Sequence, residues 1–218
     1  MKRPPAIVCI GRNYAAHASE LGHELEELPI VFFKNPASIC GAEDDIVIPS
    51  VCEHNGPQVD YEGELAVVIG QDVRDVSEQD ALECIAGYAV ANDVSARWWQ
   101  KKGSGGQYCR GKSFDTFCPM SAITPRSNVS DPQALHLVTR LNEEVVQDTS
   151  TSDMIFSISY LIAELSRGMT LLEGTVLLTG TPSGVGAAQE PKRFLCPGDV
   201  VEVEVEQVGR ICNRVVAE

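Results

Sequence analysis

The segment Asp60-Tyr-Glu-Gly-Glu64 constrains the fold of this chain most, because its acids stand directly before the apolar run 65–69. Side chains of a β-strand point alternately to opposite faces, so Asp60, Glu62 and Glu64 would share one face. Carboxylates so close together repel one another unless a positive charge lies among them. A divalent cation such as Mg²⁺ or Mn²⁺ would supply it, since hard cations prefer oxygen ligands. A solvated acidic strand edge explains the same alternation, and this segment alone leaves both interpretations open.

The segment 201–206 offers a comparison, because its glutamates also alternate along a strand pattern. There the intervening residues are all valines, which predicts a half-buried sheet with its glutamates in water. In the first segment Tyr61 and Gly63 separate the acids instead, and glycine permits the close approach of a ligand or of backbone. The two acidic patterns therefore predict different surroundings.

A length of 218 residues predicts one large domain with a real core, or two small ones. No apolar run approaches the roughly 20 residues of a membrane-spanning helix, and the apolar stretch after the basic start is too short for a secretory signal peptide. The eight cysteines form no Cys-x-x-Cys pair, and several lie in apolar strand patterns. This predicts reduced thiols rather than disulfides or a zinc site, in a cytoplasmic protein with no membrane partner.

The net charge of −14 argues against nucleic acid as a partner, because phosphate contacts need clustered lysine and arginine. The same field would repel an anionic substrate, so such a substrate requires a local positive centre. A metal ion together with one or two cationic side chains would provide that centre.

Hydrophobic periodicity predicts many short strands and few helices, hence a β-rich mixed α+β fold. Strands are expected over 5–10, 31–33, 46–48, 64–69, 87–92 and 201–206. Helices are expected over 13–21, from Ser77 to about residue 86, and from Ser152 or Asp153 to Gly168. The stretches 50–59 and 103–111 are expected to be loops, the second of them rich in glycine.

Asp93 is a further acidic candidate, because it stands at the end of the expected strand 87–92. Polar groups at strand ends leave the core, so Asp93 could add a third oxygen ligand to Glu62 and Glu64. An Asn-Asp pair before a helix is also a common N-terminal cap, and the residues alone favour neither role.

His17 and Glu20 stand three positions apart in a helical pattern, so their side chains share one face. A carboxylate orients an imidazole and stabilises its protonated form, which suits activation of a water molecule by a general base. A simple surface ion pair has the same spacing. His136, between two leucines, is interpreted as structural.

Two cationic side chains are candidates for substrate contact. Lys112 stands between a glycine-rich loop and an apolar strand, from which it could reach a carboxylate or a developing enolate. Arg12 stands beside Gly11 and close to His17. An ordinary surface lysine is the alternative interpretation of Lys112.

The segment Thr179-Gly-Thr-Pro-Ser-Gly-Val-Gly186 looks superficially like a phosphate-binding loop. It lacks the Gly-Lys-Ser/Thr ending of such a loop, and no helical pattern follows it, so we reject nucleotide binding. We expect a rigid turn that offers backbone N–H groups and the Thr181 hydroxyl to a pocket.

Taken in chain order, these segments resemble the fumarylacetoacetate hydrolase family, in particular its short single-domain branch. That branch includes acylpyruvate hydrolases, oxaloacetate decarboxylases and hydroxy-dienoate isomerases. Each motif is short, but six motifs in one order over nearly the whole chain are specific. They are Gly11-Arg-Asn-Tyr14 with His17 and Glu20, Asp60-Tyr-Glu-Gly-Glu64, Asn92-Asp-Val-Ser-Ala-Arg97, Gly111-Lys-Ser-Phe-Asp-Thr-Phe-Cys-Pro119, Thr151-Ser-Asp-Met-Ile-Phe156 and Thr179-Gly-Thr-Pro-Ser-Gly-Val-Gly186.

The resemblance implies a single catalytic domain over 1–218 with a mixed β-sandwich roll, usually assembled as a homodimer. Its N-terminal portion, about 1–50, would form a strand, a lid helix and a cover. The resemblance also implies Mg²⁺ or Mn²⁺, with Ca²⁺ as a substitute in crystals, held by the residues that match Glu62, Glu64 and Asp93. Asp60 matches no ligand of the family and becomes a supporting residue.

The residues that match His17 and Glu20 resemble the family's water-activating pair, and Lys112 matches its substrate-side lysine. Further substrate contacts are expected from Arg12, Gln100 and Thr181. The expected substrate is a small oxo acid, a β-diketo or β-keto acid, whose C–C bond is cleaved by acylpyruvate hydrolysis or oxaloacetate decarboxylation. Isomerisation of a 2-hydroxy-diene-dioate and non-catalytic binding of a small acid are the alternatives.

Two departures from the family pattern lie beside the expected pocket. Trp98 stands where family members commonly have aspartate, and 103–106 is a segment whose length and sequence we expect to vary. We therefore expect the choice of substrate, rather than the chemistry, to depend on them.

Overall fold

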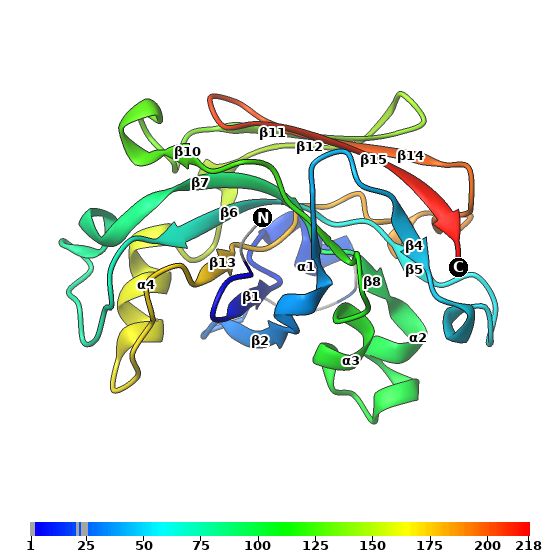
Figure 1. The fold of residues 1–218 in the computed structure, drawn as a ribbon, viewed down its shortest axis with the longest axis horizontal. Coiled ribbons are helices and arrows are strands. Elements are labelled where there is room, and N and C mark those ends of the chain that lie inside the picture. Colours follow the sequence, from blue (N-terminus) through cyan, green and yellow to red (C-terminus); the bar gives the residue numbers. More distant parts are fainter. Residues whose placement is uncertain (1–2, 21, 23–25) are drawn as a thin grey trace.

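A computed structural model describes residues 3–20, 22 and 26–218. It is a strand-rich mixed α+β fold in which two large sheets lie one above the other (Figure 1). The larger core lies between these sheets and under the helix α4 (Ile158–Ser166). The mixed β-rich α+β class expected from the periodicity is confirmed.

The first sheet has six strands and carries the acidic segment. Its strand order is β10-β7-β6-β13-β1-β2, and all neighbours are antiparallel except β1 and β13. Residues of β6 are buried at every position, so both faces of the sheet are covered at this strand. The bounds are β1 Ile7–Gly11, β2 Ile30–Lys34, β6 Gly63–Ile69, β7 Ile85–Asn92, β10 Thr124–Pro125 and β13 Val176–Leu178.

The second sheet has five strands in the order β12-β11-β14-β15-β4. On β14 the alternating valines Val201, Val203 and Val205 are buried and the glutamates between them are partly or fully exposed, which confirms the half-buried sheet predicted for 201–206. The bounds are β4 Ile46–Ile48, β11 His136–Leu141, β12 Glu144–Ser150, β14 Val200–Val205 and β15 Gly209–Ala217.

Two small sheets and three short helices complete the region around the acids. The pair β5 (Val59–Asp60) and β8 (Ser95–Ala96) places Asp60 opposite Ser95. The other small sheet pairs β3 (Ile39–Cys40) with β9 (Cys118–Pro119). The short helices are α1 Ala15–Glu20, α2 Arg97–Gln100 and α3 Tyr108–Lys112.

The prediction of a helix from Ser77 to about residue 86 is wrong. The Ser77 and Asp80 side chains do hydrogen-bond to each other, but a 3₁₀ helix, Ala81–Cys84, follows. The Gly70 N–H donates to the Cys84 carbonyl, and the chain then enters β7 as a strand paired with β6. Sheet pairing therefore overrides the local helical signal.

The segment 103–111 is also only partly the expected loop, because α3 begins at Tyr108. Gly111 lies in this helix against α2, where a side chain would collide with the Gln100 backbone. The glycine lets the two short helices pack directly against each other.

The long C-terminal helix starts later than expected, at Ile158. Asn13 holds the preceding segment extended, because its carbonyl accepts from the Ile155 N–H and its side chain accepts from the Phe156 N–H. The Ser157 hydroxyl then caps the helix by accepting from the Tyr160 N–H. The helix ends at Ser166, shortly before the expected Gly168.

All eight thiols are free, as the spacing of the cysteines predicts. Four of them are buried, three are partly buried and Cys196 is exposed. Among the described residues, no helix is long and apolar enough to cross a membrane.

Candidate metal centre and active site

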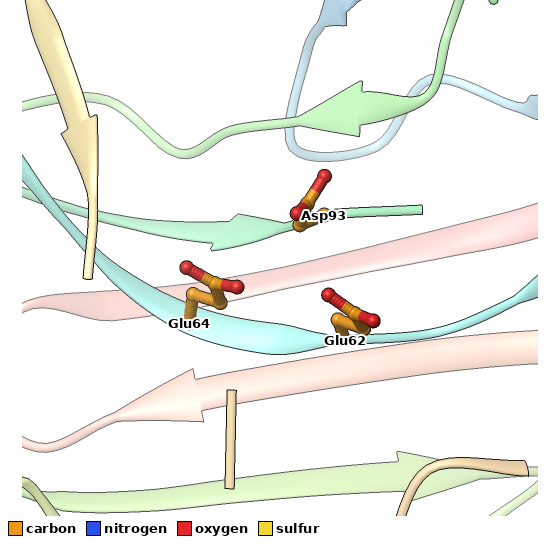
Figure 2. Close-up of side chains that lie close together, drawn as sticks. All are labelled: Glu62, Glu64 and Asp93. Atoms are coloured by element: carbon orange, nitrogen blue, oxygen red, sulfur yellow. The ribbon is translucent and has the colours of Figure 1, made fainter. Parts of the chain in front are cut away.

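Three buried carboxylates converge where β6 and β7 meet. One oxygen each from Glu62, Glu64 and Asp93 lies within 4.8 Å of the others, and Figure 2 shows the three side chains pointing toward a common space. Strand pairing creates this arrangement, because Gly63 lies opposite Asn92 and the Asp93 N–H donates to the Glu62 carbonyl at 2.8 Å. The sequence separated these acids by some 30 positions, and the antiparallel pair β6–β7 brings them together.

Three cationic side chains surround the acids. Lys112 Nζ lies between Glu62 and Asp93, 2.6 Å and 2.5 Å from their oxygens. Lys34, from β2, donates to the other Asp93 oxygen at 2.6 Å. The third, Arg97, contacts both Asp60 and Glu62.

Arg97, at the start of α2, connects Asp60 to Glu62. Its Nη1 donates to Glu62 Oε1 at 2.5 Å, and its Nη2 lies 2.7 Å from Asp60 Oδ2. Asp60 is fully buried, and it also accepts from the N–H groups of Gly186 and Ala187. Asp60 thus lies behind the cluster and holds Arg97 and a loop in place, as expected for a supporting residue.

Glu62 and Glu64 differ sharply in electrostatic surroundings. Burial alone would raise the pKa of Glu62, but the charges of Lys112 and Arg97 outweigh burial and hold that pKa well below its usual range. Burial raises the pKa of Glu64 well above its ordinary value, and the charges of Asp93 and Glu62 raise it further. Among the described residues, Glu64 has no cationic side chain within 4 Å; its carboxylate accepts from the Gly180 N–H at 2.7 Å.

The buried cluster therefore fits a divalent cation. Among the described residues it holds four carboxylates and three cationic side chains, so the carboxylate of Glu64 has no cationic partner when it is ionised. The converging ligands are all oxygens, which Mg²⁺ and Mn²⁺ prefer. Ligands at about 2.1 Å from Mg²⁺ lie up to about 4.2 Å apart, so small side-chain rotations bring the three acids onto one ion. Such an ion would be held by Glu62, Glu64 and Asp93.

His17 and Glu20 form the expected pair on α1. His17 Nδ1 lies 2.7 Å from Glu20 Oε1, and the His17 side chain is 6% exposed. An ionised carboxylate can only accept, so in the neutral ring Nδ1 carries the proton and Nε2 keeps its lone pair. The other Glu20 oxygen accepts from the Gly184 N–H at 2.9 Å, which ties α1 to the glycine-rich turn.

The turn 179–187 donates its backbone N–H groups to acids. Gly180 donates to Glu64, Gly184 to Glu20, and Gly186 with Ala187 to Asp60. The sequence predicted a rigid turn that would offer such groups to a pocket. The structure instead uses these four N–H groups to position the carboxylates around it.

A cavity of about 60 Å³ opens beside the cluster. Of the residues expected at the site, six line it: Arg12, His17, Glu62, Gln100, Lys112 and Thr181. Glu64 and Asp93 lie deeper, and Glu20 lies behind the imidazole of His17. The remaining lining residues are Ile10, Gly11, Phe32, Arg97, Lys101, Tyr108 and Ala187.

Lys112 has a different environment from the one expected. The sequence placed it toward the substrate, whereas its ammonium contacts two of the acids as well as lining the cavity. Burial alone would lower the pKa of Lys112, but Asp93 and Glu62 raise it above its ordinary value. Lys112 therefore keeps its charge and cannot serve as a general base.

Arg12 and Gln100 have partners within the protein. Arg12 lies 2.5 Å from Glu26 and donates to the Tyr108 hydroxyl at 3.4 Å. Gln100 is buried and accepts from Arg97 at 3.2 Å. Both side chains line the cavity, so a ligand would contact groups that are already held in place.

Trp98 does not line the cavity, although it stands at a position where the sequence departs from the resembled family. A side chain at position 103 would collide with its ring, so the indole packs directly over Gly103. Lys101 and Tyr108, on either side of the segment 103–106, do line the cavity. The segment 103–106 is therefore next to the cavity, although only the residues on either side of it line the cavity.

Sequence reasoning missed Lys34, Arg97 and Gln147. Lys34 follows Phe32 by two positions in a strand, which places both on one face, and this alternation could have revealed a buried lysine. Arg97 lies within a recognised motif but had no assigned role. Gln147 lies on β12 of the second sheet and accepts a hydrogen bond from the Gly63 N–H. No local sequence pattern predicts this contact. His136, interpreted as structural, lies exposed beside Asp148, outside the cavity.

Known proteins share much of this sequence. Residues 6–216 match the family described as fumarylacetoacetate (FAA) hydrolase C-terminal. The chain is 44% identical over 215 residues to human oxaloacetate tautomerase FAHD2A, mitochondrial, covering 98% of this chain and 67% of that protein. It is 44% identical over 212 residues to oxaloacetate tautomerase YisK of Bacillus subtilis, covering 96% of this chain and 69% of that protein. The chain thus spans about two thirds of the length of these relatives.

Solved structures share the fold. A 5-carboxymethyl-2-hydroxymuconate delta-isomerase from Mycobacterium smegmatis superposes with a TM-score of 0.85 at 40% identity. The superposition covers 99% of this chain and 80% of that one. The β-sandwich roll implied by the sequence motifs is therefore confirmed.

Proposed function

Since this chain belongs to the fumarylacetoacetate hydrolase family, we propose that it is a divalent-metal-dependent enzyme that interconverts the keto and enol forms of a small 2-oxo acid such as oxaloacetate. The observation that carries the proposal is the buried carboxylate cluster, in whose described surroundings Glu64 has no cationic partner, beside a cavity that His17 lines. The two curated relatives described above are oxaloacetate tautomerases, which supports oxaloacetate as the first substrate to test.

When bound by Glu62, Glu64 and Asp93, Mg²⁺ or Mn²⁺ would act as a Lewis acid toward an adjacent carbonyl oxygen. Lys112 adds a fixed positive charge beside the same acids, where negative charge develops on an enolate. Because the overall net charge is −14, this local positive centre is also what lets an anionic acid approach.

His17 supplies the proton-transfer group. Its Nδ1–H is committed to Glu20, so Nε2 can take a proton from the carbon next to the keto group. The same nitrogen returns that proton to oxygen, which converts ketone to enol without another reactant. Glu20, fixed by the Gly184 N–H, holds the ring in this tautomer.

The test is the rate at which enol oxaloacetate relaxes to the keto form, followed by the loss of enol absorbance with Mg²⁺ or Mn²⁺ present. The proposal predicts acceleration by the wild-type protein and a loss of about 100-fold or more in His17→Asn, since general acid–base groups contribute 10²–10⁴-fold. Relaxation at the uncatalysed rate with both metals would overturn it.

Cleavage of a C–C bond is a second candidate, and the His17–Glu20 pair favours it, since the same imidazole could activate water against a carbonyl. Hydrolysis of acylpyruvates needs that water, whereas decarboxylation of oxaloacetate needs enolate stabilisation alone. Glu20→Ala should then impair acylpyruvate hydrolysis far more than oxaloacetate decarboxylation. Equal losses in the two reactions would count against water activation.

Isomerisation of a 2-hydroxy-diene-dioate uses the same enolate stabilisation with a proton shuttle, and the solved relative described above is named as a 5-carboxymethyl-2-hydroxymuconate delta-isomerase. Failure to turn over any member of a panel of acylpyruvates, oxaloacetate and dienoate acids would instead favour a non-catalytic, acid-binding role.

We also propose that the partners are small oxo acids, with no nucleic acid or membrane, and that the chain assembles as a homodimer. Sedimentation equilibrium tests the dimer. A cytoplasmic location remains a prediction: the human relative is named as mitochondrial, and the Bacillus subtilis relative carries no such word.

A further inference from the structure

Gln147, on β12 of the second sheet, reaches across the core to the site. Its Oε1 accepts from the Gly63 N–H at 2.9 Å, in the strand position between two of the clustered acids. Its Nε2 donates to Thr181 Oγ1 at 2.8 Å and to the Pro182 carbonyl at 3.0 Å. Gln147 is 1% exposed, so these hydrogen bonds form a buried network.

The chemistry of its neighbours fixes which way the Gln147 amide points. The Gly63 N–H can only donate, and the Pro182 carbonyl can only accept. A flipped amide would place two donors together at Gly63 and two acceptors together at Pro182. The orientation with Nε2 toward Thr181 is therefore required, and Thr181 Oγ1 must accept there.

The Thr181 hydroxyl proton is committed as well. Oγ1 lies 3.0 Å from the Gly63 carbonyl, which can only accept, so the hydroxyl donates to it. A hydroxyl has one proton and two lone pairs. The proton goes to Gly63 and one lone pair goes to Gln147, so a single lone pair remains for a ligand in the cavity that Thr181 lines.

The backbone N–H of Thr181 donates to none of the described residues, whereas those of its neighbours Thr179 and Gly180 donate to Leu65 and Glu64. The side-chain geometry sets the polarity of the site, because the hydroxyl offers a ligand a lone pair and no proton. A ligand O–H complements this lone pair, and a bare carboxylate oxygen does not.

We propose that Thr181 accepts a hydrogen bond from a hydroxyl of the bound oxo acid, so that the site binds the enol tautomer in preference to the keto tautomer. Gln147 is the positioning residue that fixes this polarity. The inference rests on the proposed function of the site and names the form of substrate that it recognises. At neutral pH the keto form of oxaloacetate has no O–H, whereas the enol has one.

The test compares two ligands of nearly the same shape, in the presence of Mg²⁺, by titration calorimetry. Oxamate has an amide N–H₂ where oxalate has a carboxylate oxygen, so only oxamate can donate to Thr181. Thr181→Val keeps the side-chain shape and removes the acceptor. We expect oxamate affinity to fall on the order of tenfold in this variant, as one hydrogen bond is lost. Oxalate affinity should stay within about twofold.

Thr181→Ser is the matched control, because it restores the hydroxyl and should bring the ratio of oxamate to oxalate affinity back to the wild-type value. Equal losses for both ligands in Thr181→Val, a larger loss for oxalate, or no loss at all would overturn the inference and leave the proposed function intact. Failure of the wild-type protein to bind either ligand would overturn both.

Gln147→Met provides a second variant that does not alter the hydroxyl itself, and it carries the test if Thr181→Val fails to fold. Without the amide, only the Gly63 carbonyl still orients the Thr181 hydroxyl, so the hydroxyl can rotate toward a ligand more readily and oxalate should gain affinity relative to oxamate. An affinity ratio unchanged from wild type would overturn the role of Gln147. Thermal unfolding of each variant separates changes in binding from loss of the folded state.

Discussion

Two segments of this protein, 60–64 and 201–206, carry the same acidic alternation with opposite consequences. On β5 and β6 the acids Asp60 and Glu64 are 0% and 1% exposed. On β14 the side chain of Glu204 is 54% exposed, and it shares Arg140 with its neighbour Glu202 at the surface. The first set lies where both faces of a sheet are covered, and the second lies on a face open to water.

Alternation determines which residues share a face of a strand. The layer that packs on that face determines whether their carboxylates are buried or solvated. A carboxylate in water needs no partner, and its surface ion pairs contribute about 0–1 kcal/mol. A buried carboxylate must be paired or bind a metal, because desolvation costs several kcal/mol per ion. The buried acids Asp60, Glu62 and Asp93 are therefore committed to the cationic network, whereas the β14 acids need no partner.

The largest difference should appear when the central cation of each region is removed. Lys112→Met leaves Glu62 and Asp93 without their shared partner, so in the absence of metal the free energy of unfolding should fall by about 3–5 kcal/mol. Arg140→Met, on β11, removes a surface partner and should cost less than about 1 kcal/mol. Chemical denaturation with a chelator present measures both.

Added Mg²⁺ should affect the melting temperatures of these two variants differently. A divalent cation supplies positive charge to the same acids, so it should raise the melting temperature of Lys112→Met more than that of wild type. The melting temperature of Arg140→Met should respond to Mg²⁺ as wild type does. Similar losses of stability in the two variants would break the contrast between the regions.

The second effect concerns metal affinity. Glu62→Gln keeps the side-chain shape but removes a charged ligand, so Mg²⁺ binding should weaken by about 100-fold or more, since even outer-shell partners contribute 10–100-fold. Glu204→Gln is the matched substitution on β14 and should leave the dissociation constant unchanged. Titration calorimetry gives both constants, and a shared change would contradict the assignment.

The third effect concerns Asp60, which contacts the cluster only through Arg97 and backbone N–H groups. Asp60→Asn weakens these charge-assisted contacts, so unfolding free energy should fall by about 1–3 kcal/mol and activity by about tenfold. Mg²⁺ should still bind, in contrast to Glu62→Gln. Loss of metal binding equal to that of Glu62→Gln would make Asp60 a ligand.

The smallest effect is expected when two exposed acids are neutralised, Glu204 on β14 and Glu206 directly after it. The double variant Glu204→Gln, Glu206→Gln should shift stability by less than about 0.5 kcal/mol per site, because surface substitutions away from special features rarely do more. Thermal unfolding at two salt concentrations measures it. A destabilisation of several kcal/mol would mean that this face is covered in the native assembly.

The sequence allowed the convergence of acids to be predicted, but not their counter-charges. Alternation and a strand end place Glu62, Glu64 and Asp93 correctly, because strand geometry is local. Lys34 and Gln147 arrive from β2 and β12, and only the packing of distant strands brings them to the site. Because these two residues are far from the acids in the sequence, no residue spacing could have predicted their contacts.

Local signals failed where pairing competed with them. The turn at Ser77 predicted a helix, but the neighbouring chain is drawn into β7 by pairing with β6. The segment before Ile158 has helical periodicity, yet Asn13 holds it extended through two hydrogen bonds. In both cases a long-range backbone contact outweighs a propensity of a few tenths of a kcal/mol per residue.

The most direct test of the buried acids as a metal centre is anomalous diffraction from crystals grown with Mn²⁺. The account predicts one strong peak about 2.1–2.2 Å from carboxylate oxygens of Glu62, Glu64 and Asp93, with no peak beside Glu202 or Glu204. A fully occupied peak elsewhere, or no peak among the three acids at saturating Mn²⁺, would contradict it.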